Sequence, residues 1–171
     1  FAKALAYAWK KPFVPVHHIE GHLFSAFLGD KAPEFPYLAL VVSGGHTQII
    51  HCAEPHTYEL LATTRDDAVG ECFDKVARLL GLPYPGGPSI QKAAQGGNTK
   101  AYAFPRAMQR QDTLDFSYSG LKTAVLYTTR ENPGANVADL AASFQAAAVD
   151  MLILTTRLAL EPTGAELLVI A

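Results

Sequence analysis

Three histidines and one glutamate lie within six residues in VHHIEGH, the segment that begins at Val16. If a helix begins at His18, residues four apart lie about 40° apart around its axis, so His18 and His22 share one face. Two imidazoles on one face can bind one metal ion, although a complete site needs further ligands. Alternatively, these histidines are capping or surface residues at the start of a helix.

The position of the glutamate bears on whether this segment is a zinc-protease site. In the H-E-x-x-H signature the glutamate adjoins the first histidine and acts beside the metal as general base. Glu20 instead lies roughly 160° to 200° around the helix axis from His18 and His22. The order of residues therefore argues against a zinc protease. No second cluster of histidines and carboxylates stands out in the sequence, so a third ligand must come from elsewhere.

A Gly-Gly turn between two apolar runs is the second stretch that could bind a ligand. The run VVSGGHTQII places Gly44 and Gly45 at the tip of an expected antiparallel hairpin, flanked by the hydroxyls of Ser43 and Thr47. Glycine lets backbone amides approach phosphate oxygens closely, so this turn could form an anion-binding nest. The alternative is a hairpin turn with no ligand.

The amphipathic helix expected from Asp67 to Leu80 carries acidic residues with more than one interpretation. Asp74 lies four residues before Arg78, and a second acid–base pair has the same spacing. Solvated ion pairs explain both without a ligand. The carboxylate of Asp74 could equally accept hydrogen bonds from ribose hydroxyls. In the loop that follows, Gly86 and Gly87 would let a flat ring approach the backbone.

These stretches are embedded in alternating helical and strand-like patterns, which indicate an α/β architecture. Ser119 is expected to cap one helix and Asn136 a longer one that Gly164 ends. The expected helices run to about Trp9, from His18 to Leu28, from Asp67 to Leu80, from Ser89 to Gln95, from Ser119 to Thr129 and from Asn136 to Gly164, and the expected strands are Tyr37–Val42, Gln48–Ala53 and Glu166–Ala171. A polar stretch of weak periodicity precedes Phe116.

Composition bounds the class of protein. The 171 residues are 49% hydrophobic and 18% charged with a formal net charge of −2, as in a soluble globular domain that is a poor nucleic-acid binder by itself. Cys52 and Cys72 form no C-x-x-C pair, which favours a reducing compartment. No apolar run approaches a membrane span and no signal-peptide pattern is seen, so a cytoplasmic protein is expected. The apolar ends suggest a fragment of a longer chain.

In their order and spacing, the runs HHIEGH, LVVSGGHTQI, DDAVGECFDKVARLLGLPYPGGP and FSYSGLKT closely resemble the TsaD family. These are tRNA threonylcarbamoyladenosine transferases that were formerly described as O-sialoglycoprotein endopeptidases, or glycoproteases. The resemblance implies the two-lobed α/β fold of actin, Hsp70 and sugar kinases (ASKHA). Residues 1–171 would form its central part, from the end of the first lobe through much of the second, with N-terminal and C-terminal parts missing.

The resemblance also implies roles for individual residues. His18 and His22 match the ligands of one divalent metal per subunit, iron or zinc, whose third ligand, an aspartate, is expected beyond Ala171. His46 has a suitable place for a general base, but the sequence assigns no catalytic residue. The positions matched to substrate contacts are Val41, Val42, Ser43, Gly44 and Gly45 for the phosphate and acyl group, and Asp74 and Gly87 for the ribose and base.

The implied reaction transfers threonylcarbamoyl from threonylcarbamoyl-adenylate to the exocyclic amine of the adenosine next to the tRNA anticodon. The metal would act as Lewis acid and template. The expected partners are tRNA, held partly by other surfaces, a TsaB-like paralogue and a TsaE-like ATPase, with no membrane. Two alternatives stay open: a metal-dependent glycoprotein endopeptidase, and a non-catalytic nucleotide-binding paralogue.

Overall fold

The computed structural model describes residues 1–106 and 113–171 and has the alternating α/β order expected from the sequence. Helices and strands follow one another without an internal repeat. In chain order the elements are α1 (Ala2–Ala8), α2 (His18–Ser25), the short 3-10 helix η1 (Ala26–Leu28), β1 (Tyr37–Val42), β2 (Thr47–Glu54), β3 (Thr57–Thr63), α3 (Val69–Leu79), α4 (Gly86–Ala93), α5 (Ser119–Glu131), α6 (Val137–Thr163) and β4 (Leu167–Ile170).

The four strands form one mixed sheet in the order β3-β2-β1-β4. β1 and β2 are antiparallel, with Tyr37 opposite Cys52 and Val42 opposite Thr47, so the expected hairpin around the glycine turn is confirmed. β4 pairs with β1 in parallel, an arrangement that needs a crossover connection, which the helices provide here. In the described part of the chain, β1 therefore has a partner on both sides.

Alternate residues of β1 pack into two separate cores, because successive side chains of a strand point to opposite faces. Leu38 and Leu40 belong to the larger core, which the sheet shares with α3, α4, α5 and α6. Ala39 and Val41 belong to the smaller core with Ile19 and the rest of the buried stripe of α2. The sheet is therefore covered by several helices on one face and by α2 on the other, and its strand β1 is apolar throughout.

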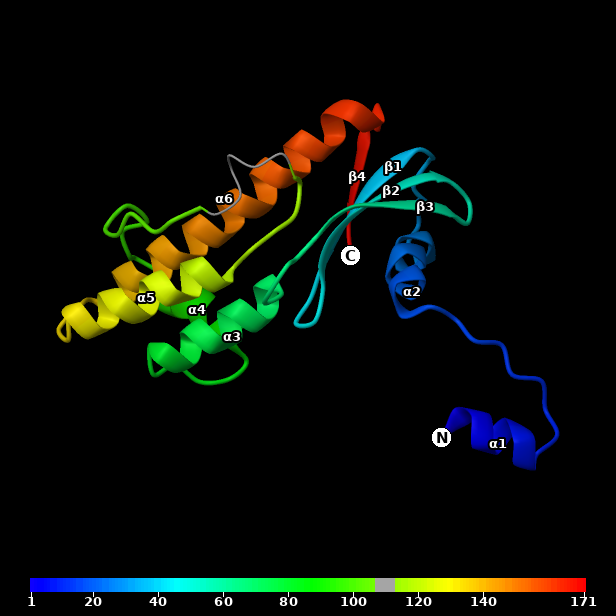
Figure 1. Cartoon of the computed structure of the whole chain (residues 1–171), viewed down its shortest axis with the longest axis horizontal. Coiled ribbons are helices and arrows are strands. Elements are labelled where there is room, and N and C mark those ends of the chain that lie inside the picture. Colours follow the sequence, from blue (N-terminus) through cyan, green and yellow to red (C-terminus); the bar gives the residue numbers. More distant parts are fainter. Residues whose placement is uncertain (107–112) are drawn as a thin grey trace.

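Figure 1 shows α3 to α6 gathered as one group of helices, with the long helix α6 leading from that group to the sheet and into β4. α2 lies against the sheet away from this group. α1 stands apart at the end of an extended segment, and none of its residues is buried. The run Phe13–Val16 leads from α1 towards α2 without forming a strand.

α6 is the longest of the described elements and forms the central helix of the larger core. The side chain of Asn136 caps it by accepting the amide of Ala138 at 2.9 Å, and Gly164 ends it with a left-handed φ of 62°, as expected. By length and composition alone it could cross a membrane, which the sequence analysis did not anticipate. Of its most apolar window, 44% is buried inside the molecule, and Leu140, Phe144 and Met151 pack in the larger core.

Several helices and strands differ in their bounds from those expected from the sequence. β3 was not anticipated, since its run TYELLAT mixes polar and apolar residues without alternation and pairs with β2 through irregular register. Ser119 is the first residue of α5 and not its cap, because its hydroxyl donates to Asp66 at 2.7 Å. α3 begins at Val69 and α4 already at Gly86. Residues 107–112 of the expected polar stretch lie outside the described residues.

Both cysteines are free and buried, in agreement with the absence of any paired pattern in the sequence. Burial raises the pKa of the Cys72 thiol to about 12. A thiol with such a pKa is protonated at neutral pH and is a poor nucleophile or metal ligand. Cys72 is therefore a core residue of α3.

Candidate active site

The histidine pair lies on the exposed side of α2. Ile19 and Leu23 anchor this helix on the sheet, with 9% and 2% of their surfaces exposed. His18 and His22 lie on the same side of the helix, as their spacing predicts, and their Nε2 atoms are 3.2 Å apart. At that distance the two ring nitrogens can share a hydrogen bond, one donating and the other accepting. The pair is therefore already convergent without any bound ion.

Glu20 lies away from the pair, as expected. It lines a separate hollow of about 320 Å³ between α2 and the sheet, together with Gln48 and Tyr58. Neither His18 nor His22 lines that hollow. The glutamate of this helix therefore does not take the place that a zinc protease gives to its general base.

A third imidazole lies near His18. His46 follows the glycine turn, and the centroid of its ring lies 5.6 Å from that of His18. The rings of His18 and His22 are closer to one another, at 4.6 Å and edge to face. Within residues 1–106 and 113–171, no group of three or more His, Cys, Asp or Glu side chains is arranged to hold a metal ion. The described chain thus offers two ligands of a metal site.

The turn from Ser43 to His46 is held by its own serine. The amides of Gly45 and His46 both donate to Oγ of Ser43, at 3.3 and 3.0 Å, and the amide of Ser43 donates to the carbonyl of His46 at 2.9 Å. Two successive amides therefore converge on one oxygen, which is the arrangement of an anion nest. An added Cβ at Gly44 or Gly45 would meet nothing within 4 Å, so this tip is open to solvent.

The beginning of α3 packs against this turn. The amide of Val69 donates to Oγ of the fully buried Thr47 at 2.8 Å, which ties the start of the helix to β2. Gly70 follows, and a Cβ there would lie 2.6 Å from the carbonyl oxygen of Ser43 and 2.9 Å from Cα of Gly44. Only a glycine allows so close an approach. The turn therefore lies directly against the amino end of a helix, where backbone N–H groups favour anions.

One turn further along α3, Asp74 contacts the amino end of α4. Its Oδ1 accepts the amide of Gly86 at 2.7 Å, so it has a partner that the sequence did not suggest in place of the expected Arg78. The second expected acid–base pair is confirmed, with Lys75 Nζ 2.8 Å from the carboxylate of Glu71. Asp74 keeps its other carboxylate oxygen and further lone pairs for a ligand.

The two glycines that follow Pro85 have different environments. Gly86 is buried, and a Cβ on it would lie 2.4 Å from Cα of Asp74, so α4 touches α3 backbone to backbone. Gly87 has open space where its side chain would be. Of the two positions, Gly87 is therefore the one that a ligand can reach.

These contacts connect the predicted substrate residues into one line, which we call the α3 track. It is made of the Ser43–His46 turn, Gly70 and Asp74 on one face of α3, and Gly87 at the start of α4. Val41 and Val42 lead into the turn at the end of β1. Gly70 had no assigned role and His46 only a suitable place for a general base, although the four-residue spacing of Gly70 and Asp74 could have indicated a shared helix face.

A carboxylate network that the sequence pattern did not indicate lies before the amino end of α3. Asp66 accepts the hydroxyls of Ser117 and Ser119 at 2.5 and 2.7 Å, and also the amide of Tyr118 at 2.8 Å. Burial alone raises the pKa of the Asp66 carboxyl, but these hydrogen bonds outweigh burial and lower it below its usual value. The network fixes the start of α5 to the segment between β3 and α3.

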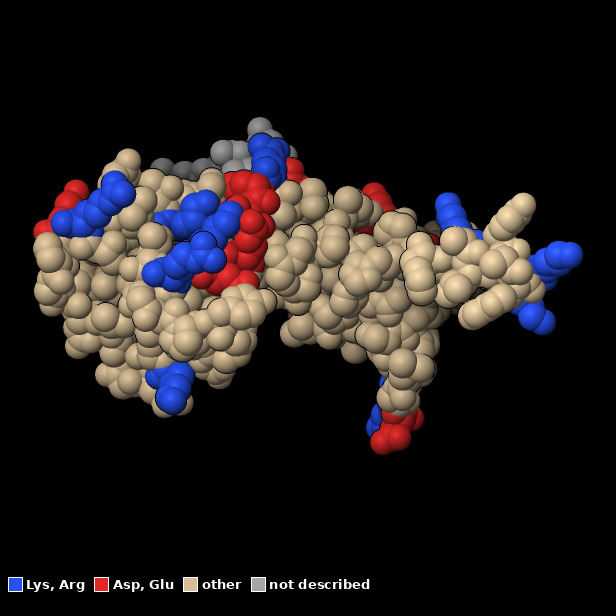
Figure 2. All heavy atoms as spheres, turned by 90° about the horizontal axis from the view of Figure 1, so that it is seen from below, with Lys and Arg blue, Asp and Glu red and all other residues tan. Residues whose placement is uncertain are grey.

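The neighbouring Asp67 joins the same helices through ion pairs. Its carboxylate lies 2.6 Å from Nζ of Lys75 on α3 and 2.7 Å from Nζ of Lys122 on α5. Burial raises the pKa of Asp67, and the two lysines more than compensate, so the net pKa is lowered. The face in Figure 2 accordingly shows basic and acidic side chains side by side on the helical part of the molecule. Such a mixture agrees with the expected weakness of this chain as a solitary nucleic-acid binder.

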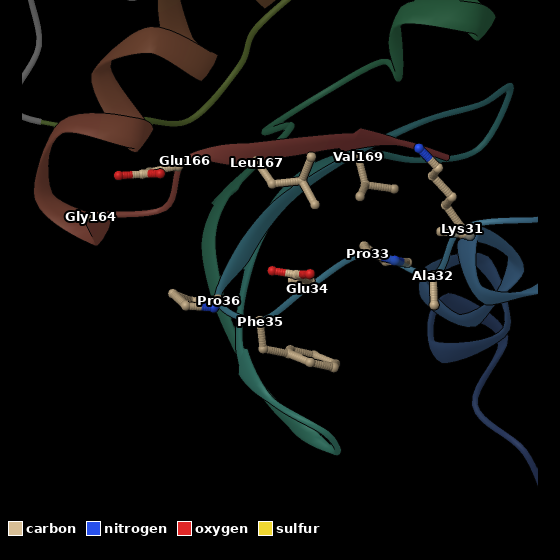
Figure 3. Close-up of a pocket in the computed structure, with 11 residues that line it drawn as sticks. Lys31, Ala32, Pro33, Glu34, Phe35, Pro36, Gly164, Glu166, Leu167 and Val169 are labelled. Atoms are coloured by element: carbon tan, nitrogen blue, oxygen red, sulfur yellow. The ribbon is translucent and has the colours of Figure 1, made fainter.

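A larger hollow than the one beside Glu20 lies elsewhere. It measures about 780 Å³ and is formed by the loop from Lys31 to Pro36, the turn after α6 and strand β4. Figure 3 shows Leu167 and Val169 of β4 opposite Glu34 and Phe35 of this loop. None of the residues predicted for a metal or a nucleotide lines it. Because its few charged groups do not converge, we place the site on the α3 track and not in this larger hollow.

Comparison with known proteins gives a consistent result. A family model described as "TsaD: tRNA N6-adenosine threonylcarbamoyltransferase" matches residues 1–171. A tRNA N6-adenosine threonylcarbamoyltransferase of Desulfitobacterium hafniense (strain Y51) is 53% identical over 174 residues, covering 99% of this chain and 51% of that protein. One from Paraburkholderia xenovorans (strain LB400) is 50% identical over 175 residues, with coverage of 99% and 51%. The chain thus spans about half the length of these curated relatives.

Proposed function

The chain belongs to the TsaD family, and on this premise we propose that it forms the central part of a tRNA threonylcarbamoyladenosine transferase. In the proposed reaction, the exocyclic amine of the adenosine next to the anticodon attacks the carbamoyl carbon of threonylcarbamoyl-adenylate. A carbon–nitrogen bond forms, the bond from that carbon to the phosphate oxygen breaks, AMP leaves and the amine loses a proton. We further propose the two-lobed ASKHA fold for the whole protein, with residues 1–171 spanning the end of one lobe and much of the other.

The observation that carries this proposal is the order of groups along the α3 track. The histidine pair lies at one end, the nest of the Ser43–His46 turn comes next, and Asp74 and Gly87 follow at the other end. An acyl-adenylate presents its acyl group, phosphate, ribose and base in the same order. A single extended ligand can therefore contact each group of residues in turn.

The nest is the proposed binding place of the phosphate. Oγ of Ser43 already occupies the point on which the amides of Gly45 and His46 converge, and a phosphate oxygen can replace it there. The amino end of α3 beside Gly70 adds partial positive charge. Both features also stabilise the negative charge that AMP gains as it leaves. At the other end of the track, Asp74 would accept a ribose hydroxyl and Gly87 would lie against the base.

His18 and His22 fit one divalent metal, iron or zinc. Two imidazole nitrogens bound to tetrahedral zinc at about 2.0–2.1 Å lie about 3.3 Å apart, close to the 3.2 Å between these Nε2 atoms. When bound, the metal supplies a Lewis acid that polarises an oxygen of the acyl group. We place the remaining protein ligand, an aspartate, outside residues 1–171.

The proposed setting is the cytoplasm, with tRNA as substrate and with a TsaB-like paralogue and a TsaE-like ATPase as partners. Two observations support this setting: the relatives are named as tRNA-modifying enzymes, and the charge of this chain is slightly negative. A surface that mixes acidic and basic groups needs help from other surfaces to hold a polyanion. The glycopeptidase alternative lacks support, because Glu20 lies in a hollow apart from the histidine pair.

Calorimetric titration with AMP and with a non-hydrolysable acyl-adenylate, with and without Zn²⁺, tests the proposal. We expect both nucleotides to bind and Zn²⁺ to strengthen binding of the acyl-adenylate. Asp74→Ala should weaken both by roughly tenfold, the worth of one hydrogen bond to a charged group.

Asp139→Ala is the matched control, because this carboxylate also accepts one backbone amide at 2.7 Å but lies at the start of α6. If Asp74→Ala and Asp139→Ala bind both nucleotides like the wild type, the α3 track is not the nucleotide site. Loss of tRNA modification by His18→Ala and His22→Ala, with zinc binding lost in parallel, would support the metal assignment.

A further inference from the structure

His46 is a chemically active side chain at the proposed site whose place suits a general base but to which the sequence assigns no catalytic role. Its ring lies between the two groups of residues that the proposed function separates, the histidine pair and the phosphate nest. The distance from its centroid to that of His18 is 5.6 Å, and its own amide forms part of the nest. In the proposed binding mode, a side chain in this position would lie near the junction of acyl group and phosphate.

The backbone of His46 is fixed from both sides. Its amide donates to Oγ of Ser43 at 3.0 Å and its carbonyl accepts the amide of Ser43 at 2.9 Å. The next residue, Thr47, is fully buried and tied to the start of α3 by the 2.8 Å hydrogen bond from Val69. The imidazole therefore projects from a rigid part of the hairpin, which is what a group that selects a ligand requires.

The arrangement of the three rings favours a contact with substrate over a third bond to the metal. His18 and His22 have nitrogens 3.2 Å apart, as two ligands of one ion do, and the described residues contain no third His, Cys, Asp or Glu arranged with them. The ring of His46 is tilted by 50° to that of His18 and lies farther away than His22 does. At 5.6 Å the rings of His46 and His18 are in ordinary aromatic contact, so a ligand oxygen would reach His46 beside the pair and not between the two rings.

Resting on the proposed function, we propose that the imidazole of His46 donates a hydrogen bond to an oxygen of the acyl–phosphate junction and thereby makes the site prefer acyl-adenylates over AMP. AMP fills the nest, Asp74 and Gly87 but carries no acyl oxygen for His46 to contact. An acyl-adenylate reaches from the nest to the histidine pair and passes this imidazole. His46 is thus a specificity residue of the donor substrate.

The test compares the binding of two ligands to the zinc-loaded, full-length protein. AMP and a non-hydrolysable acyl-sulfamoyl adenosine are titrated calorimetrically into the wild type and His46→Ala. We expect the acyl analogue to bind His46→Ala roughly tenfold more weakly and AMP to bind within about twofold of the wild type, since one hydrogen bond is lost only with the acyl group. His46→Gln, which keeps an N–H donor, should recover most of the lost affinity.

His56→Ala is the matched control, because His56 occupies the turn between β2 and β3, the other hairpin of the same sheet. It should bind both ligands like the wild type. Equal weakening of AMP and analogue in His46→Ala would overturn the inference and assign His46 to the nest. Lost zinc affinity would also overturn it and make His46 a metal ligand.

The remaining outcomes separate this inference from the proposed function. If the wild type binds the analogue and His46→Ala binds it equally well, only the role of His46 is wrong. If the wild type binds neither AMP nor the analogue, the nucleotide site itself is wrong, and the inference falls with it.

Discussion

Two adjacent glycines at the start of α4 should respond in opposite ways to the same substitution. A Cβ on Gly86 would lie 2.4 Å from Cα of Asp74, 2.5 Å from the carbonyl oxygen of Phe73 and 2.6 Å from the amide nitrogen of Asp74. All three atoms are backbone, so no side-chain rotation relieves the overlap. A Cβ on Gly87 would meet nothing within 4 Å.

The expected cost of Gly86→Ala has two parts. Carbon atoms pack at about 3.5–4.0 Å, so α4 has to move away from α3 by more than about 1 Å, at an overpacking cost of roughly 1–3 kcal/mol. The movement also lengthens the 2.7 Å hydrogen bond from the Gly86 amide to the Asp74 carboxylate, which is worth about 1.5–3 kcal/mol. We expect a loss of about 3–5 kcal/mol in the free energy of unfolding, a large share of the 5–15 kcal/mol typical of a protein.

Urea unfolding followed by circular dichroism measures this loss. With a slope of about 2 kcal/mol per molar urea, the midpoint of Gly86→Ala should fall by about 2 M. Gly87→Ala should unfold at or above the wild-type midpoint, because alanine is preferred over glycine in a helix by up to about 1 kcal/mol. Its AMP affinity should fall instead, because the new methyl group enters the ligand side of the α3 track. A Gly86→Ala protein within 1 kcal/mol of the wild type would refute the reasoning about backbone contact.

Three further outcomes follow from the same structure. Gly70→Ala should keep the fold but displace the turn at Ser43, because the carbonyl oxygen of Ser43 would lie 2.6 Å from the new Cβ. Calorimetry should then show at least a tenfold loss of AMP affinity. Unchanged affinity would argue against the nest as the phosphate site. Asn136→Ala should lower stability by about 1 kcal/mol in urea unfolding through loss of the α6 cap, and an unchanged midpoint would show that the cap contributes little. Because the folded-state pKa of Asp66 is lowered, its stabilisation is present above the unfolded pKa of about 3.9 and is lost as the pH falls through the folded pKa. Asp66→Asn should therefore be less stable at neutral pH but lose less stability below about pH 4 in pH-dependent thermal unfolding, and parallel curves for the two proteins would contradict this.

Local patterns were sufficient to predict most elements of the fold. The continuous run of six apolar residues in β1, the cap at Asn136 and the terminating Gly164 each depend on a few neighbouring residues, and each is confirmed. β3 could not be predicted in this way, because it is a partly exposed strand whose pairing with β2 has irregular register. Ser119 was misplaced because its hydroxyl bonds Asp66, a residue far away in the sequence.

The candidate site shows the same division between local and distant information. The helical spacing of His18 and His22 predicted their shared face, and the structure places their nitrogens 3.2 Å apart. By contrast, the partner of Asp74 is the amide of Gly86, which becomes adjacent only when α4 packs on α3. The contact of Gly70 with the turn also depends on tertiary structure. The substrate roles of Val41, Asp74 and Gly87 stay predictions.

The parallel pairing of β1 with β4 has a consequence for the order of folding. Tyr37 pairs with Leu167, so this edge of β1 is covered only when the long segment between the two strands, which contains the helical group, has folded or looped back. Contacts between residues so distant in sequence form late, whereas the hairpins that join β1, β2 and β3 are local. Until β4 arrives, the uncharged run YLALVV presents an unpaired strand edge, which is a template for association between chains. The refolding yield of this protein should therefore fall as its concentration rises, and the stability of α6 should govern how long the exposed edge persists.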